Sequence, residues 1–91
     1  MRTFSRTNQF KKDVKRAERR GKDMAKFKAI LERLIEGESL PPESRDHPLR
    51  GDFASSRDCH IEPDWVLIYT LSEKGSHVCF ERTGTHSDLF R

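Results

Sequence analysis

The chain has few cysteines and no long apolar run, and both shortages exclude classes of protein. Its two cysteines, Cys59 and Cys79, form no CxxC pair, so the sequence suggests neither a disulfide framework nor a zinc site. We expect two buried thiols. No stretch reaches the roughly 20 apolar residues of a membrane helix, and the first six residues lack the apolar centre of a secretory signal. We therefore expect a cytoplasmic protein that does not contact a membrane.

Glycine and proline are also scarce, with 5 and 4 residues among 91. Three of the four prolines lie in residues 37–48, which show no periodicity and predict a connecting loop. The chain has no internal repeat or low-complexity segment. We expect residues 1–91 to form a single domain with a modest core, because small folds bury a smaller share of their surface.

Positive charge is concentrated in one half of the chain, although the net charge is only +3. Residues 1–36 carry 12 Lys/Arg against 5 Asp/Glu, whereas residues 37–91 carry 6 against 10. A basic segment favours an anionic partner such as nucleic acid. A solvated helix surface is the simpler interpretation of the same charges.

The first half of the chain predicts an extended start followed by a helical hairpin. Thr7 or Asn8 can cap a first helix with apolar positions at Phe10, Val14 and Ala17. Gly21 interrupts this pattern. A second helix is predicted over residues 22–36, because its apolar positions recur on one face. They are Met24, Phe27, Ile30, Leu31, Leu34 and Ile35.

The second half predicts an antiparallel meander. Strands are expected over residues 56–62, 66–71 and 77–83, with a turn at 73–75 and a terminal helical turn at 85–90. The apolar run 66–71 suits a central strand that is covered on both faces. The fold class is therefore α+β: an N-terminal strand, a two-helix hairpin and a β-meander with the helices packed on the sheet.

A group of polar side chains in the second half suits cleavage of a phosphodiester bond. The set is His47, His60, His86, Asp64 and Arg82. Such a reaction needs a base for the attacking oxygen, an acid for the leaving oxygen and a cation for the charged phosphorane. Histidine serves both proton roles near neutral pH. With RNA, the 2′-hydroxyl of the substrate can be the nucleophile, so the reaction requires neither a metal nor a nucleophile from the protein, and we expect no cofactor.

Each of these residues also has a structural interpretation. His47 can satisfy loop backbone, Asp64 can belong to an ordinary turn, and Arg82 can pair with Asp58 or Glu81 across the sheet. His77 is predicted to be a surface residue of a strand. The two aromatic candidates, Trp65 and Phe90, are expected in the core or a pocket wall, with base stacking as the open alternative.

Three ordered blocks of the sequence resemble the YafQ branch of the RelE/ParE toxin superfamily. They are residues 46–51 (DHPLRG), 57–69 (RDCHIEPDWVLIY) and 80–86 (FERTGTH), followed by Leu89-Phe90. The match also includes Lys22-Asp23-Met24 at the start of the second helix. The resemblance spans the chain from the N-terminal strand to the C-terminus, and the fold it implies agrees with the α+β class above.

The resemblance implies a ribosome-dependent endoribonuclease that cuts messenger RNA in the decoding site. It implies His86 as the general acid, His47 and Asp64 as candidates for the base, and His60 in a positioning or proton-transfer role. Arg82 would stabilise charge on the phosphate. The two aromatic residues, Trp65 and Phe90, would shape the pocket wall. The expected products are a 2′,3′-cyclic phosphate, or its opened form, and a 5′-hydroxyl.

The implied partners are the 70S ribosome with its ribosomal RNA, messenger RNA, and a cognate antitoxin in an assembly of two copies each. The basic residues 1–36 would then contact RNA phosphates. The competing function is that of a ParE-like toxin, which poisons DNA gyrase without cleaving nucleic acid. The histidines argue against it, because such a toxin needs no proton-transfer groups. A non-catalytic nucleic-acid-binding regulator is a further alternative.

Overall fold

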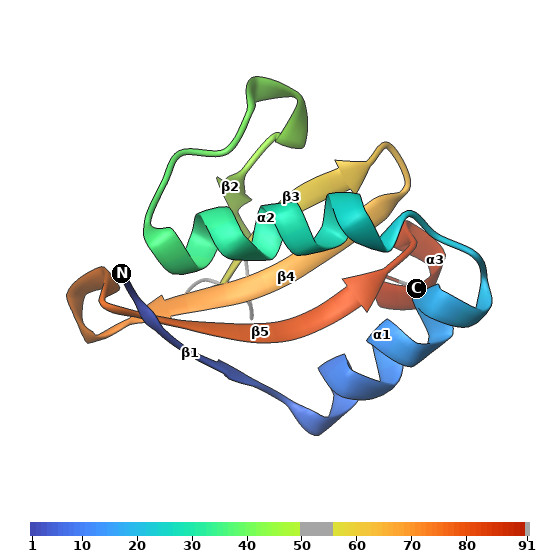
Figure 1. Cartoon of the computed structure of the whole chain (residues 1–91), viewed down its shortest axis with the longest axis horizontal. Helices are drawn as coiled ribbons and strands as arrows, with labels where there is room; N and C mark the ends of the chain where they lie inside the picture. Colours follow the sequence, from blue (N-terminus) through green and yellow to red (C-terminus); the bar gives the residue numbers. More distant parts are fainter. Residues whose placement is uncertain (50–55, 91) are drawn as a thin grey trace.

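The computed structural model describes residues 1–49 and 56–90, and within them two helices pack against one face of a five-stranded sheet (Figure 1). In chain order the elements are β1 (Thr3–Arg6), α1 (Asn8–Arg19), α2 (Met24–Glu36), η1 (Pro42–Ser44), β2 (His47–Pro48), β3 (Ser56–Glu62), β4 (Trp65–Ser72), η3 (Glu73–Gly75), β5 (His77–Gly84) and α3 (His86–Leu89). This arrangement confirms the predicted α+β class, with its N-terminal strand, helical hairpin and meander.

Local side-chain caps decide where the helices begin and end. The hydroxyl of Thr7 accepts a hydrogen bond from the backbone N–H of Phe10, which fixes the start of α1. The carboxylate of Asp23 accepts from two backbone N–H groups of the next turn, so α2 begins at Met24 rather than at the predicted residue 22. Gly37 ends α2 with φ of 79°, a left-handed conformation that favours glycine.

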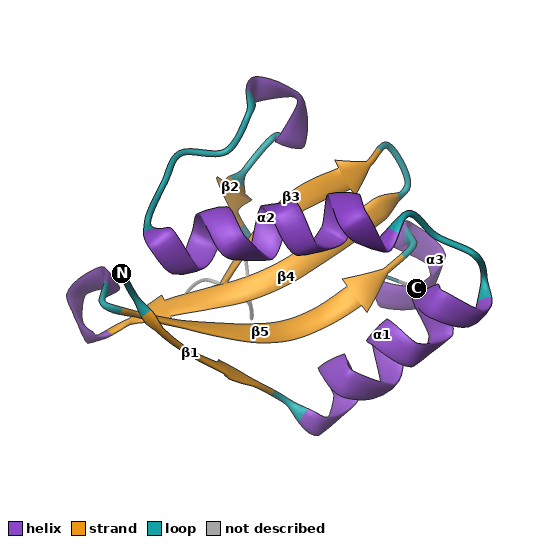
Figure 2. Ribbon diagram, viewed as in Figure 1, coloured by secondary structure: helices purple, strands orange, loops and turns teal. Residues whose placement is uncertain are grey.

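The strand order in the sheet is β1-β5-β4-β3-β2, with β3, β4 and β5 forming the predicted antiparallel meander. β1 pairs in parallel with β5, and α1 runs beside β5 beyond the end of β1 (Figures 1 and 2). The segment 37–48, predicted as a loop, contains η1 and ends in the short edge strand β2. β2 is important for the site because it adds His47 to the sheet.

The core lies between the two helices and the sheet. Phe27 stacks on Trp65 with ring centroids 5.3 Å apart, and Phe10 stacks on both Phe27 and Phe80. The further buried members are Ala17, Ile30, Leu34, Cys59, Leu67, Tyr69 and Val78. Burial of these side chains supplies most of the driving force for folding.

One prediction about burial was wrong: of the two thiols, Cys59 is buried but Cys79 is only partly so. On α1, Phe10 and Ala17 are buried and Val14 packs against the core while partly exposed. Asp13 is buried on the same helix. Asp13 can lie in the core because other groups satisfy its carboxylate, as described below.

Candidate active site

The sheet register brings four side-chain positions into one row across four strands. His47 on β2 pairs with Asp58 on β3, Asp58 with Ile68 on β4, and Ile68 with Arg82 on β5. Because Trp65, Leu67 and Tyr69 of β4 point to the helices, the alternate residues Val66 and Ile68 point to the other face. We call this second side of the sheet the polar face; it carries His47, Asp58, His60 and Arg82.

His86 and Asp64 lie at the end of this face. Asp64 is in the turn between β3 and β4, and His86 is the first residue of α3. The Asp64 Oδ1 accepts one hydrogen bond from the backbone N–H of His86 at 3.0 Å and is 2.7 Å from the Nδ1 of the same residue. These two bonds, the backbone bond foremost, lower the pKa of Asp64. The carboxylate therefore remains ionised and orients the imidazole ring.

His60 faces His86 from β3. The centroids of the two imidazole rings are 5.5 Å apart in an edge-to-face arrangement. Burial lowers the pKa of His60, and the nearby charge of Asp58 only partly opposes this effect. His60 is therefore favoured in its neutral form, in which one ring nitrogen can accept a proton.

His47 and Asp58 form a second histidine–carboxylate pair. The Nε2 of His47 lies 2.9 Å from the Oδ1 of Asp58, and its Nδ1 lies 2.6 Å from the carbonyl oxygen of Arg45. Asp58 is only 5% exposed, and within residues 1–49 and 56–90 its Oδ1 has no well-aligned hydrogen bond. Burial raises the pKa of Asp58. Both ring nitrogens of His47 face an oxygen atom, one of Asp58 and one of Arg45.

Arg82 does not pair with Asp58 or Glu81, the two partners considered from the sequence. Its Nε donates to the Oδ2 of Asp13 on α1 at 2.8 Å, and its Nη2 donates to Oδ1 at 3.4 Å. Glu81 instead accepts a hydrogen bond from Thr70. The sheet register shifts by a β-bulge between Ile68 and Tyr69, opposite this part of β5, and such bulges change the direction of nearby side chains.

The two aromatic candidates lie in different environments. Phe90 is 40% exposed, and its ring centroid is 6.0 Å from that of His86, so it borders the histidine group. Trp65 is 1% exposed; it stacks on Phe27 and donates its indole N–H to the hydroxyl of Thr83 at 3.0 Å. The structure therefore places Trp65 in the core on the helix side, away from the polar face.

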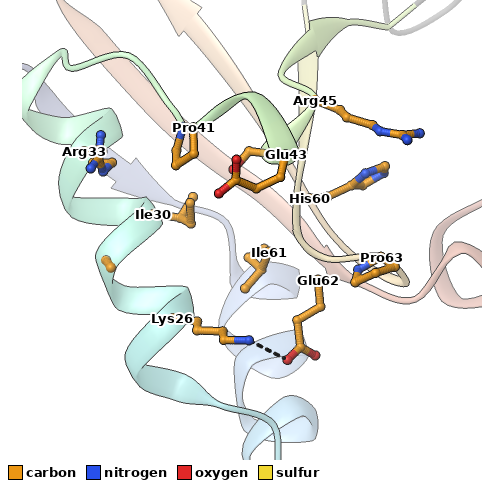
Figure 3. A pocket seen from close by; sticks show the side chains of 12 residues that line it. Lys26, Ile30, Arg33, Pro41, Glu43, Arg45, His60, Ile61, Glu62 and Pro63 are labelled. Carbon is orange, nitrogen blue, oxygen red and sulfur yellow. Dashed lines mark ion pairs between the residues drawn. The ribbon is translucent and has the colours of Figure 1, made fainter.

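Two hollows adjoin these residues. The first, about 440 Å³, lies on the polar face beside Arg82; the lining residues are Thr7, Gln9, Ser56, Ile68, Thr70, Glu81 and Arg82. The second, about 650 Å³, lies between α2 and β3, with Ile30, Ile61 and Pro41 in its wall and the Lys26–Glu62 ion pair at one end (Figure 3). His60 borders the second hollow, but the other proposed catalytic groups do not line it. We place the candidate active site on the polar face.

Two functional candidates were missed in the sequence. Asp58 is two residues from His60 on the same strand, and period-two alternation already predicts that both point to one face. Asp13 is three residues after Phe10 and four before Ala17, so helical periodicity places its charge on a buried stripe.

Of the first resembling block, Arg50 and Gly51 lie outside the described residues. Among described residues, no group of three or more His, Cys, Asp or Glu side chains is arranged to hold a metal ion.

A five-stranded sheet with two helices on one face is the architecture of small RelE-like toxins. The crystal structure of YafQ from Escherichia coli strain BL21(DE3) superposes on this chain with a TM-score of 0.92 at 44% identity, covering 100% of both chains. The YafQ of the crystal structure of the E. coli DinJ-YafQ toxin-antitoxin complex gives a TM-score of 0.91 at 46% identity, covering 99% and 98%.

Sequence comparisons agree with the structural ones. The family model described as "Bacterial toxin of type II toxin-antitoxin system, YafQ" matches residues 2–91. The mRNA interferase toxin YafQ of E. coli strain K12 is 49% identical over 85 residues, which cover 92% of this chain and 90% of that protein. The chain belongs to the YafQ family of bacterial toxins. In its described part, no helix is long and apolar enough to cross a membrane.

Proposed function

We propose that this chain is a ribosome-dependent endoribonuclease that acts in the cytoplasm and cleaves messenger RNA in the decoding site without a metal ion. The observation that carries the proposal is the pairing of two histidines with two carboxylates on one side of the sheet, His86 with Asp64 and His47 with Asp58. The relative named an mRNA interferase toxin, 49% identical to this chain, supports it.

His86 acts as the general acid in this proposal. The 2′-oxygen of the substrate attacks the adjacent phosphorus, and the bond from phosphorus to the 5′-oxygen breaks. The protonated ring of His86 gives its proton to that 5′-oxygen, while Asp64, 2.7 Å from Nδ1, holds the ring and stabilises its charge. The products are a 2′,3′-cyclic phosphate, which water can open, and a 5′-hydroxyl.

His60 is the best candidate for the base. Burial lowers its pKa, which favours the neutral ring that must accept the proton of the 2′-hydroxyl. Asp64 is less suited to this role because its Oδ1 is already engaged by His86. His47, beside the buried Asp58, supplies positive charge close to the phosphate. Arg82 supplies a second cation, and Phe90 borders the substrate at His86.

The outer side of α1 is suited to contact ribosomal RNA. Lys11, Lys12, Lys15 and Arg19 are exposed and recur on one side of the helix, and none of them forms an ion pair with another residue of the described part. We call these four residues the α1 patch. Such a cluster attracts phosphates independently of sequence.

A cognate antitoxin is the proposed regulatory partner, in an assembly of two toxins with two antitoxins. An E. coli YafQ has been crystallised in a complex with DinJ. An antitoxin that covers the α1 patch of this chain is expected to present acidic side chains there, because opposite charges favour association.

Primer extension on a defined messenger RNA in a purified translation system tests the proposal. Wild-type protein is expected to cut at in-frame codons only when ribosomes are present, and His86→Ala to lower cleavage by roughly 10²–10⁴-fold. His77→Ala is the matched control, since His77 binds Thr3 and Ser5 at the β1 edge. Folded wild-type protein that cuts no RNA, or that instead traps DNA gyrase on broken DNA, would refute the nuclease function.

A further inference from the structure

Asp13 is a charged residue in the core of the molecule, and the functions proposed above do not use it. Its side chain on α1 is 0% exposed. Its two oxygens accept hydrogen bonds from four groups, the side chains of Gln9, Arg16 and Arg82 and the backbone N–H of Thr83. A buried carboxylate with this many donors is held in one position and in turn holds its partners.

We propose that Asp13 is a positioning residue, which directs the guanidinium of Arg82 toward the scissile phosphate of the RNA. This inference rests on the proposed nuclease function. The hydrogen bonds to Asp13 use the Nε–H of Arg82 and one N–H of its Nη2. A guanidinium has five N–H donors in a rigid plane, so three remain, two on Nη1 and one on Nη2. The adjacent N–H groups of Nη1 and Nη2 have the geometry for a bidentate contact with phosphate.

The location of Asp13 explains how the direction of Arg82 is fixed. Asp13 also accepts from the backbone N–H of Thr83, the residue after Arg82, at 3.1 Å. The carboxylate therefore fixes both the backbone and the side chain of β5 at the point where β5 lies against α1. The Arg82 side chain is 34% exposed beside the hollow of the polar face, so its outer edge remains accessible to a ligand.

The other charged groups near Asp13 leave Arg82 available for a phosphate. Arg16 also donates to Asp13, at 3.1 Å, so two guanidinium groups share this carboxylate. Arg16 lies 3.6 Å from a second carboxylate, that of Asp88, which also binds Arg20. Arg16 and Arg20 are therefore paired with these two carboxylates, and Arg82 is the cation that Asp13 aligns for an anionic phosphate.

A double-mutant cycle separates positioning from simple stabilisation. The variants are Asp13→Asn, Arg82→Met and their combination, assayed by single-turnover cleavage of messenger RNA on programmed ribosomes. Asp13→Asn is expected to lower the cleavage rate roughly 10–100-fold at saturating toxin, since a small misplacement of a catalytic group is costly. The combination is expected to be no slower than Arg82→Met alone, because Asp13 acts through Arg82.

Arg16→Met is the matched control. It removes the other arginine from the same carboxylate, so it is expected to lower the melting temperature while the cleavage rate stays within about twofold of wild type. If Asp13→Asn cleaves at the wild-type rate, or if its effect multiplies with that of Arg82→Met, the proposal is wrong. Failure of wild-type protein to cut RNA would instead count against the nuclease function itself.

Asp13→Glu keeps the proposal testable if Asp13→Asn does not fold. Glutamate keeps the charge but moves the carboxylate by one methylene group, so a folded Asp13→Glu protein is expected to lose cleavage rate about tenfold with little change in KM. A folded Asp13→Glu protein with the wild-type rate would show that the direction of Arg82 does not depend on Asp13.

Discussion

His47 and Asp58 approach within 2.9 Å, yet Oδ1 of Asp58 lacks a well-aligned hydrogen bond within the described residues. The carboxylate is buried, and burial raises its pKa. An acid with a raised pKa in the folded state opposes folding while it is ionised, and this penalty disappears as the pH falls through that pKa. Asp58 is therefore retained at a cost in stability, which is typical of a functional group.

Asp58→Asn is accordingly expected to stabilise the protein at pH 7 and to impair cleavage. Removing one buried, poorly paired charge is expected to raise the free energy of unfolding by about 1 kcal/mol. This increase raises the melting temperature of a domain of this size by ~4–8 °C. The gain should shrink as the pH falls toward 4, because wild-type Asp58 then takes up a proton. Thermal melts from pH 4 to 8 measure this, and a constant difference at every pH would contradict it.

Cleavage by Asp58→Asn is expected to fall by about tenfold or more, since the ring of His47 loses the carboxylate that faces its Nε2. The single-turnover rate on programmed ribosomes measures this loss. His77→Ala is a suitable control, because it also removes a histidine of the sheet, but one that binds Thr3 and Ser5 at the β1 edge. Equal rates for wild type and Asp58→Asn would remove Asp58 and His47 from the catalytic group.

Asp64→Asn tests the orientation of the general acid. An amide cannot stabilise the charged ring of His86 as the carboxylate does, so kcat is expected to fall by roughly 10²-fold while KM stays near the wild-type value. Asp64 is exposed on a turn, and the melting temperature should change little. Steady-state kinetics of ribosome-bound cleavage provide the measurement, and a rise in KM alone would instead indicate a binding role.

Trp65→Phe distinguishes a core residue from a pocket wall. The variant loses the hydrogen bond to Thr83 and part of the stack on Phe27, which is expected to cost about 1–2 kcal/mol in the free energy of unfolding. Because Trp65 is buried on the helix side, the cleavage rate of the folded variant should stay within about twofold of wild type. Urea denaturation measures the loss of stability, and cleavage assays measure the rate. A folded variant that cleaves tenfold more slowly would indicate that Trp65 lines the substrate pocket.

The sequence predicts the elements of this fold well because each has a local signal. Thr7 marks the start of α1, Gly37 marks the end of α2, and alternation defines β5. β2 could not be predicted, since its two residues become a strand only by pairing with β3. The long-range pairing of β1 with β5 is likewise absent from any local pattern.

The candidate site was only partly predictable for the same reason. His86, His60 and His47 carry chemistry that is visible in their residue type. The partners considered for Arg82 from the sequence were wrong. Its observed partner, Asp13, is 69 positions away in the chain, and an Asp on a helix is by default expected to be exposed to solvent. Trp65 was ambiguous, since an aromatic residue at the start of a strand suits either face until the register is known.

The α1 patch provides a test of ribosome recognition that is independent of chemistry. If Lys15 contacts an RNA phosphate, Lys15→Glu should weaken binding to ribosomes and reduce the slope of log affinity against log salt by roughly 0.7–0.9. Lys74→Glu is the matched control, because Lys74 is an exposed residue of η3 on the turn from β4 to β5 and the change in net charge is the same. Co-sedimentation with ribosomes from low to high salt measures both variants. Equal slopes for both and for wild type would show that α1 does not contact ribosomal RNA, and the charge of residues 1–36 would then belong to another anionic partner, such as an acidic antitoxin.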